Sequence, residues 1–334
     1  NVSDFFQNYN FDLVVADEVH KIRKSNSQIS QSIFNLKKKR FWGLTGTPIE
    51  NNMEDLLTLL GHLTGSSMHP KDKNRSTLHL LESIKPYILR RMKSQVLNEL
   101  PKVTERDYGV EILEEQKLEY KNIWENRHSI INSEGSNFSV LSKLRKVCDG
   151  GKDHTKNSKI ITAGEIIKNI QNNGEKVIVF SYYLDPLYAL NNYLNTEGIK
   201  SVKFFDIELE EREKNIEKFK SDDSITAFIA SSRIASEGLT LTEANNVIFL
   251  NRWWNPSSNS QARDRVVRIG QEKPVMIYNL YCLGTIEERV TEILKQKRNA
   301  LLIILGLWQL GFSALVFIIS IFFSSKNIFK LYHT

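Results

Sequence analysis

Two neighbouring stretches, Asn251-Arg-Trp-Trp-Asn-Pro256 and Arg263-Asp-Arg-Val-Val-Arg-Ile-Gly-Gln271, decide the fold of this chain. Gln261, Arg265 and Arg268 fall at positions i, i+4 and i+7, so on a helix they would share one face. Two guanidiniums held side by side can neutralise the charge that spreads over a γ-phosphate during its transfer. The alternative is a basic helix face that only meets solvent. The stretch therefore predicts an arginine-bearing helix, and the motifs elsewhere in the chain favour the phosphate-binding interpretation.

The composition is that of an ordinary globular protein with room for more than one domain. The chain has 334 residues, of which 41% are hydrophobic and 25% charged, and its formal net charge is +6. This length predicts two or more domains, each with its own core. The positive charge is compatible with a polyanionic partner. Cys148 and Cys282 are far apart in the sequence and have no nearby ligand spacing, so a disulfide scaffold or a zinc site is not expected and a reducing cytosolic setting is the default.

Residues 1–61 predict a parallel α/β unit. The β-branched run Phe11–Ala16 has the character of a buried strand, and Phe41–Thr45 of a second one. Between them, residues 25–36 carry apolar side chains at helical spacing, as a crossover helix would. A strand, a helix and a strand in this order indicate a parallel sheet.

The pattern changes to charged helices over residues 62–157, most clearly at 113–124 and 138–147, and residues 150–158 have the composition of a linker. Residues 158–298 then predict a second α/β unit. Its five short apolar runs predict strands at residues 176–181, 201–205, 226–230, 246–250 and 275–279. Helices are expected at residues 186–197 and 210–220, with a closing helix at 287–298.

The last segment, residues 299–334, does not fit this scheme. Residues 301–325 contain no charged side chain, and about 23 helical residues span roughly 35 Å, enough to cross a bilayer. The basic cluster Lys295, Lys297 and Arg298 would hold the preceding side in the cytoplasm. A disruption of the reading frame near Lys297 is the simpler of the two explanations for this apolar tail.

Two further motifs, Asp17-Glu-Val-His20 and Leu44-Thr-Gly-Thr-Pro-Ile-Glu-Asn51, accompany the arginine-rich stretch. Together the three resemble the Snf2 family of superfamily 2 helicase-like ATPases, and the similarity runs from about Phe11 to about Lys297. Pro86-Tyr-Ile-Leu-Arg-Arg-Met-Lys93 also matches the Snf2 pattern, which DEAH-type RNA helicases lack. The resemblance implies an α/β fold of two RecA-like lobes with parallel sheets, the first one truncated, joined by a helical insertion and followed by an apolar C-terminal helix.

The resemblance also implies ATP and Mg²⁺ as cofactors. It assigns Asp17 to Mg²⁺, through the water shell of the ion, and Glu18 to activating the attacking water. The end of a parallel strand, where both lie, is where ligands bind in open α/β sheets, although an Asp in this position can also cap a helix. The nucleotide-binding positions are Asp17, Glu18, Gly238, Gln261, Arg265 and Arg268, and Glu18, Arg265 and Arg268 are the catalytic ones among them.

A second set of residues is assigned by resemblance to nucleic-acid contact and coupling: His20, Thr45, Gly46, Thr47, Thr242, Trp254, Arg90 and Arg91. Each has a plainer interpretation: a turn at Thr45–Pro48, a solvated helix face at Arg90 and Arg91, and a core aromatic at Trp254. In the loop before Thr242 the family usually has glycines where this chain has Ala235 and Ser236. Only Gly238 and Thr242 are therefore carried over from that loop.

A phosphate-cradling loop of the form Gly-x4-Gly-Lys-[Ser/Thr] is not found, since the nearest candidate, Gly151-Lys152, is followed by Asp153. The family places this loop upstream of the Asp-Glu motif. Because the chain opens at Asn1 without a signal peptide, we expect it to enter in mid-sequence. Without the loop the phosphates lack their cradle, so this chain alone is expected to hydrolyse ATP poorly.

We interpret the sequence as the carboxyl-terminal portion of an ATPase that moves along double-stranded DNA and remodels DNA-bound proteins. Such a protein is expected in the cytoplasm, at the nucleoid, or in a nucleus. One alternative is a DEAH-type RNA helicase, which stimulation by RNA rather than duplex DNA would reveal. The other is a non-catalytic DNA-binding remnant anchored in a membrane through residues 301–323, which would have no affinity for nucleotide.

Overall fold

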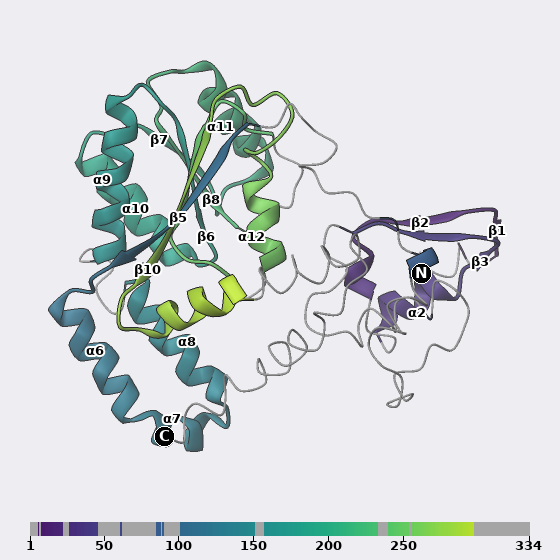
Figure 1. Cartoon of the computed structure of the whole chain (residues 1–334), viewed down its shortest axis with the longest axis horizontal. Coiled ribbons are helices and arrows are strands. Elements are labelled where there is room, and N and C mark those ends of the chain that lie inside the picture. Colours follow the sequence, from purple (N-terminus) through teal and green to yellow (C-terminus); the bar gives the residue numbers. More distant parts are fainter. Residues whose placement is uncertain are drawn as a thin grey trace. The chain divides into compact units, whose positions relative to one another are not determined.

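The computed structural model divides the chain into two units, which are described separately (Figure 1). The described residues are 6, 8–22, 27–45, 61, 85–87, 89, 101–150, 157–232, 240–253 and 256–296. The first unit precedes Ser94, and the second comprises the described residues from 101 to 296. Several predictions fall outside the described residues: Gly46, Thr47, Arg90, Arg91, Gly238, Trp254 and the apolar segment 301–323. In the part of the chain that is described, no helix has the length and apolar character needed to cross a membrane.

The first unit contains the expected strand, helix and strand. Strand β2 (Val14–Ala16) pairs in parallel with β4 (Phe41–Gly43), and α2 (Gln28–Phe34) lies between them in sequence. The expected strand Phe11–Ala16 is interrupted, because its first part forms a separate short strand, β1 (Asn10–Phe11), which pairs in parallel with β3 (Lys37–Lys38).

A small core holds this unit together. Val19 and Ile22, in the 3₁₀ helix η1 (Val19–Ile22), are buried against Ile33, Phe34 and Phe41. A second short 3₁₀ helix, η2 (Lys85–Tyr87), is described further along the chain.

The second unit is built on a six-stranded sheet in the order β5-β10-β9-β6-β8-β7, and every neighbouring pair is parallel. Its strands are β5 (Val103–Val110), β6 (Val177–Ser181), β7 (Ser201–Phe204), β8 (Ala227–Ser231), β9 (Asn246–Phe249) and β10 (Val275–Cys282). Central strands β6, β8 and β9 are buried throughout, as expected for a parallel sheet covered on both faces. All five predicted strands of this unit are confirmed.

Helices cover both faces of the sheet (Figure 1). On one face, α9 (Ser158–Asn172) and α10 (Leu184–Thr196) contribute Ile160, Ile167, Leu187 and Leu190 to one core cluster. On the other, α11 (Leu209–Ser221) and α12 (Pro256–Arg263) contribute Phe219 and Ala262 to a second cluster. The closing helix is present at residues 286–296.

Strand β5 is the main departure from the predicted secondary structure. The sequence predicts charged helices over residues 62–157, and α6 (Glu114–Glu125), α7 (Arg127–Glu134) and α8 (Asn137–Cys148) agree with it. Residues Val103–Val110 instead pair with β10 along eight residues, from Val103 beside Val275 to Val110 beside Cys282. This edge strand is largely exposed, so its charged side chains gave no local signal for a strand.

Candidate nucleotide and nucleic-acid site

The Asp-Glu motif lies where β2 ends. Asp17 is exposed, and its Oδ1 accepts a hydrogen bond from the backbone N–H of Glu18 at 2.8 Å. Glu18 has a φ of 50°, in the left-handed region that a residue with a side chain seldom adopts. Such a backbone costs on the order of 1–3 kcal/mol and persists only where its surroundings impose it. The turn therefore fixes the direction in which the Glu18 carboxylate leaves the strand.

His20 connects this turn to the segment after β4. Its imidazole is buried, with Nδ1 at 2.9 Å from Thr45 Oγ1 and at 3.1 Å from Glu18 Oε2. Backbone hydrogen bonds from Val19 N–H to the carbonyl of Leu44 and from Leu44 N–H to the carbonyl of Ala16 hold the two segments together. Three of the predicted site residues, Glu18, His20 and Thr45, are thus brought into one cluster.

The residues at the end of β2 suit a divalent cation with a preference for oxygen. The Asp17 carboxylate is exposed, and the Glu18 side chain is 34% exposed. Carboxylate oxygens at an open strand end match the ligands that Mg²⁺ takes, with water completing its shell. The assignment of Asp17 to the ion stays a prediction.

The predicted arginine helix is shorter than expected, and Gln261, Arg265 and Arg268 do not share one helix face. Helix α12 ends at Arg263, and the N–H of Arg268 bonds to the carbonyl of Val266, only two residues back. Ala262, Val266 and Val267, on both sides of the end of this helix, are all buried in the same core cluster.

The segment that follows α12 does not continue the helix and forms hydrogen bonds with residues 240–244. Arg268 Nη1 donates to Thr240 Oγ1 at 2.9 Å, and Leu241 N–H donates to the carbonyl of Arg265 at 3.3 Å. The amide of Gln271, itself buried, donates to the carbonyls of Thr242 at 2.9 Å and Ala244 at 2.7 Å. The two predicted motifs of this unit therefore form one structure, which places Thr242 close to the arginine segment.

Arg265 is partly exposed and Arg268 is exposed, so both guanidiniums belong to the surface of the second unit. Gln261 lies on α12 itself and is partly exposed. Their assignment to a nucleotide remains a prediction.

Sequence reasoning missed the aromatic pair beside this segment. The rings of Trp253 and Tyr182 stack with centroids 3.7 Å apart and planes 11° from parallel. Asn259, on α12, accepts from the N–H of Trp253 at 3.0 Å and donates to its carbonyl at 2.9 Å. Trp253 thus joins the end of β6 to the start of α12, and the Trp-Trp pair was the only signal for it.

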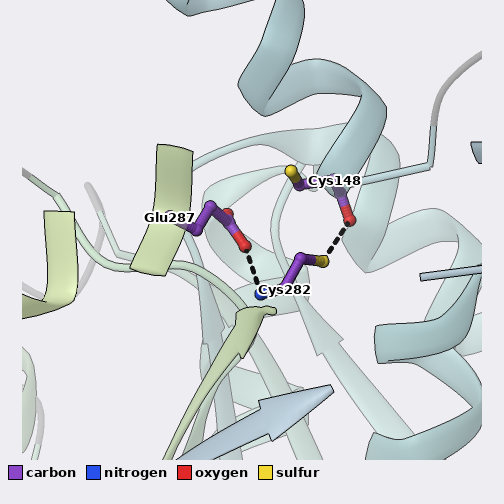
Figure 2. A group of neighbouring side chains, drawn as sticks. All are labelled: Cys148, Cys282 and Glu287. Carbon is purple, nitrogen blue, oxygen red and sulfur yellow. Dashed lines mark hydrogen bonds between the residues drawn. The ribbon is translucent and has the colours of Figure 1, made fainter. Parts of the chain in front are cut away.

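Among the described residues, one group of side chains has the spacing of a metal site: Cys148, Cys282 and Glu287, with potential ligand atoms within 4.8 Å of one another (Figure 2). The Glu287 carboxylate accepts from Lys159 Nζ, at 2.9 and 3.0 Å, and from the Cys282 N–H at 3.0 Å. A contact with Cys148, together with burial, raises the pKa of the Cys282 thiol well above its ordinary value. A protonated thiol and a carboxylate already neutralised by lysine do not favour a metal, so we assign none here.

Comparison with known proteins completes the description of the site. The family model of the SNF2-related domain matches residues 1–173, and that of the helicase conserved C-terminal domain matches residues 158–270. The chain belongs to the SNF2 family. An SNF2 protein solved as the Sulfolobus solfataricus SWI2/SNF2 ATPase core in complex with dsDNA is 30% identical, with a TM-score of 0.50 over 88% of this chain and 69% of that one. Its likeness agrees with the RecA-like α/β fold that the sequence predicts.

Two curated relatives extend the comparison. An uncharacterized ATP-dependent helicase of Mycoplasma genitalium is 35% identical over 86% of this chain and 30% of its own length. The human DNA excision repair protein ERCC-6 is 28% identical over 88% of this chain and 23% of its own length. The chain therefore spans less than a third of these SNF2 relatives.

Proposed function

We propose that this chain is part of an SNF2 ATPase that hydrolyses ATP in response to double-stranded DNA and moves along the duplex. The observation that carries the proposal is the position of His20, whose Nδ1 contacts both the Glu18 carboxylate and the Thr45 hydroxyl. This contact joins the carboxylate assigned to water activation to the segment assigned to nucleic-acid coupling. A relative named as an ATP-dependent helicase and an SNF2 core solved with duplex DNA support the same activity.

In this proposal Glu18 is the general base. A carboxylate can accept a proton from the attacking water when it is held in the right direction, and the turn at Glu18 and its contact with His20 provide that orientation. A shift of Thr45 on DNA binding would move His20 and, through it, Glu18. Hydrolysis would thereby respond to the nucleic acid.

The arginines supply positive charge. Arg265 and Arg268 lie at the surface, where a bound triphosphate can reach them, and guanidiniums suit the oxygens of a γ-phosphate. Mg²⁺ held near Asp17 would neutralise further phosphate charge when bound.

Duplex DNA is the proposed partner, and the remodelling of DNA-bound proteins the proposed outcome. Contacts of a translocating protein go mainly to phosphates, so affinity should fall steeply with salt and depend little on base sequence. Fluorescence anisotropy of labelled duplexes of unrelated sequence would measure both properties. Affinity that is insensitive to salt would contradict the proposal.

The decisive experiment measures ATP hydrolysis by the full-length protein with duplex DNA, with RNA and with neither. We expect stimulation by duplex DNA. Equal stimulation by RNA would favour the DEAH-type RNA helicase, and absence of ATP binding would favour the non-catalytic alternative.

Glu18→Gln should abolish turnover and spare ATP binding, because it removes the base without removing bulk. Asp12→Asn is the matched control, since it removes an exposed carboxylate of the same unit that pairs with Lys39 in a surface contact.

A further inference from the structure

A buried ion cluster lies in the second unit, at the carboxyl ends of strands β6, β9 and β10. Lys159, in the first turn of α9, is 1% exposed, and its ammonium contacts Asp149 Oδ1 at 2.6 Å and both oxygens of Glu287 at 2.9 and 3.0 Å. Asp149 follows α8, and Glu287 lies in the helix at residues 286–296, so three helices meet at one ammonium. Neither the sequence motifs nor the proposed chemistry uses these charges.

The ammonium is held in its charged form. Burial by itself lowers the pKa of Lys159. The carboxylates of Asp149 and Glu287 outweigh this effect and raise the pKa of Lys159 well above its ordinary value. Burial raises the pKa of Asp149, and the charge of Lys159 acts against that rise. The cluster therefore depends on Lys159, because without it two buried carboxylates would lose the ammonium that both of them contact.

The cluster continues to the segment that precedes α12. Asn251, 2% exposed, donates from Nδ2 to Asp149 Oδ1 at 3.1 Å and to Ser181 Oγ at 2.9 Å. Its Oδ1 accepts from the N–H of Tyr182 at 2.8 Å. Asn251 thus forms hydrogen bonds both to the ion cluster and to residues at the end of β6.

The next two residues are fastened as well. The backbone carbonyl of Arg252 accepts a hydrogen bond from Arg145 Nη2 at 2.7 Å. The guanidinium of Arg252 contacts Asp107 Oδ1 at 3.0 Å. Trp253 stacks on Tyr182 and exchanges two hydrogen bonds with Asn259 of α12. Because Asn251, Arg252 and Trp253 are consecutive, the backbone links the ion cluster to the contacts of Trp253 with Tyr182 and with Asn259 of α12.

We propose that Lys159 is a positioning residue, which through Asp149 and Asn251 fixes the Trp253 segment and so the place from which Arg265 and Arg268 extend. Its effect on catalysis rests on the proposed function, whereas its effect on Trp253 does not. An error of about 1 Å in the position of a catalytic group can cost on the order of 100-fold in rate. A buried ion cluster bonded to the segment that precedes α12 is a rigid means of avoiding such an error.

Lys176 offers a matched control. It is also a buried lysine of this unit, but it precedes β6 and donates to the carbonyls of Phe219 and Asp222, at the opposite ends of the strands. Lys176→Met removes another largely buried lysine charge, and none of the contacts of Lys176 described here involves Asn251. A purely structural role of Lys159 predicts that both substitutions only lower stability.

The test compares Lys159→Met, Lys176→Met and Asn251→Ala in this chain. Quenching of tryptophan fluorescence by acrylamide is measured for each variant and for the same variant carrying Trp253→Phe, and the difference gives the quenching of Trp253. Each measurement is made well below the melting temperature of the variant. We expect Lys159→Met and Asn251→Ala to lose protection of Trp253, and Lys176→Met to keep it. Asn251→Ala leaves the ion cluster paired, so it decides the question even if Lys159→Met does not fold. Unchanged protection in Asn251→Ala, or equal loss in Lys176→Met, would overturn the proposal.

A second measurement uses the full-length protein. If it hydrolyses ATP on duplex DNA, Asn251→Ala should lower kcat by about 10- to 100-fold, because the arginines remain but are misplaced. If the parent protein shows no hydrolysis, the proposed function fails, and the Trp253 measurement still decides whether Lys159 positions the segment.

Discussion

The guanidinium of Arg268 is held by the hydroxyl of Thr240, with Nη1 at 2.9 Å from Oγ1. Thr240 is a neutral partner, so Arg268 can exchange this hydrogen bond for one to a phosphate oxygen without breaking an ion pair. A phosphate group carries negative charge and can accept two parallel N–H bonds from a guanidinium, whereas the Thr240 hydroxyl is neutral and accepts one, so the exchange is favourable. The contact with Thr240 holds Arg268 in place before a nucleotide arrives.

Arg268→Ala should lower kcat for hydrolysis stimulated by duplex DNA by about 10³-fold in the full-length protein, the usual scale for an arginine that neutralises a transferred phosphoryl group. Arg268→Lys should recover only part of the loss, because lysine keeps the charge but lacks the planar fork. Thr240→Val removes only the hydroxyl and should change kcat far less. Steady-state hydrolysis at saturating ATP measures all three, and full activity of Arg268→Ala would exclude the assigned role.

Gln271→Met should destabilise the second unit by about 2–3 kcal/mol, because it leaves the partly buried carbonyl of Thr242 and the buried carbonyl of Ala244 without their donor. The side chains are similar in size, so lost packing contributes little. Urea unfolding followed by circular dichroism measures the change. Lys273→Met, an exposed substitution two residues away, is the control; a loss as large as that of Gln271→Met would show that the measurement does not report the buried bonds.

The two cysteines should react with thiol reagents only after the second unit unfolds. Both are buried, and a contact with Cys148 together with burial raises the pKa of Cys282, so at pH 8 that thiol stays protonated in the folded chain. In the unfolded chain its pKa returns to the ordinary range and the thiolate fraction rises. The rate of reaction with a disulfide reagent in increasing urea should follow the loss of ellipticity. Rapid reaction without urea would contradict the described burial.

A fragment of residues 101–296 should fold by itself, whereas one that begins at residue 112 should not. Removing β5 exposes one edge of β10 along eight residues. It also removes Asp107, the partner of the Arg252 guanidinium, and Glu105, which accepts from Asn279 at 3.0 Å. Size-exclusion chromatography and thermal unfolding of both fragments test this, and a monomeric, cooperatively unfolding short fragment would show that β5 is dispensable.

The apolar strands were the most predictable part of the fold. Runs such as Val177–Ser181 and Asn246–Phe249 are buried on both faces, so their composition alone identifies them. Strand β5 could not be found in this way, because Glu105, Arg106 and Asp107 are suited to a charged helix as well. Its conformation is decided by pairing with β10, some 170 residues later in the chain.

The site was predictable where a motif is local. By resemblance the sequence assigned Glu18 to catalysis and His20 and Thr45 to coupling, and in the structure His20 contacts both of the others. The helix carrying Gln261, Arg265 and Arg268 was predicted too long, because spacing does not reveal that α12 ends at Arg263 and that the following residues bond to the segment 240–244. The ion cluster of Lys159 was missed for a related reason, since its partners Asp149 and Glu287 come from separate helices.

The strand order has a consequence for how the second unit is made on the ribosome. β10 is the last strand to be synthesised, yet it lies between β5, the first, and β9. Until β10 emerges from the ribosome, β5 has no neighbouring strand in the sheet, so it stays unpaired while the rest of the unit is synthesised. Pairing between segments so distant in sequence is slow to form. Completion of the sheet is thus postponed to the end of translation of this unit, and during that interval the free edges of β5 and β9 are open to a chaperone or to wrong partners.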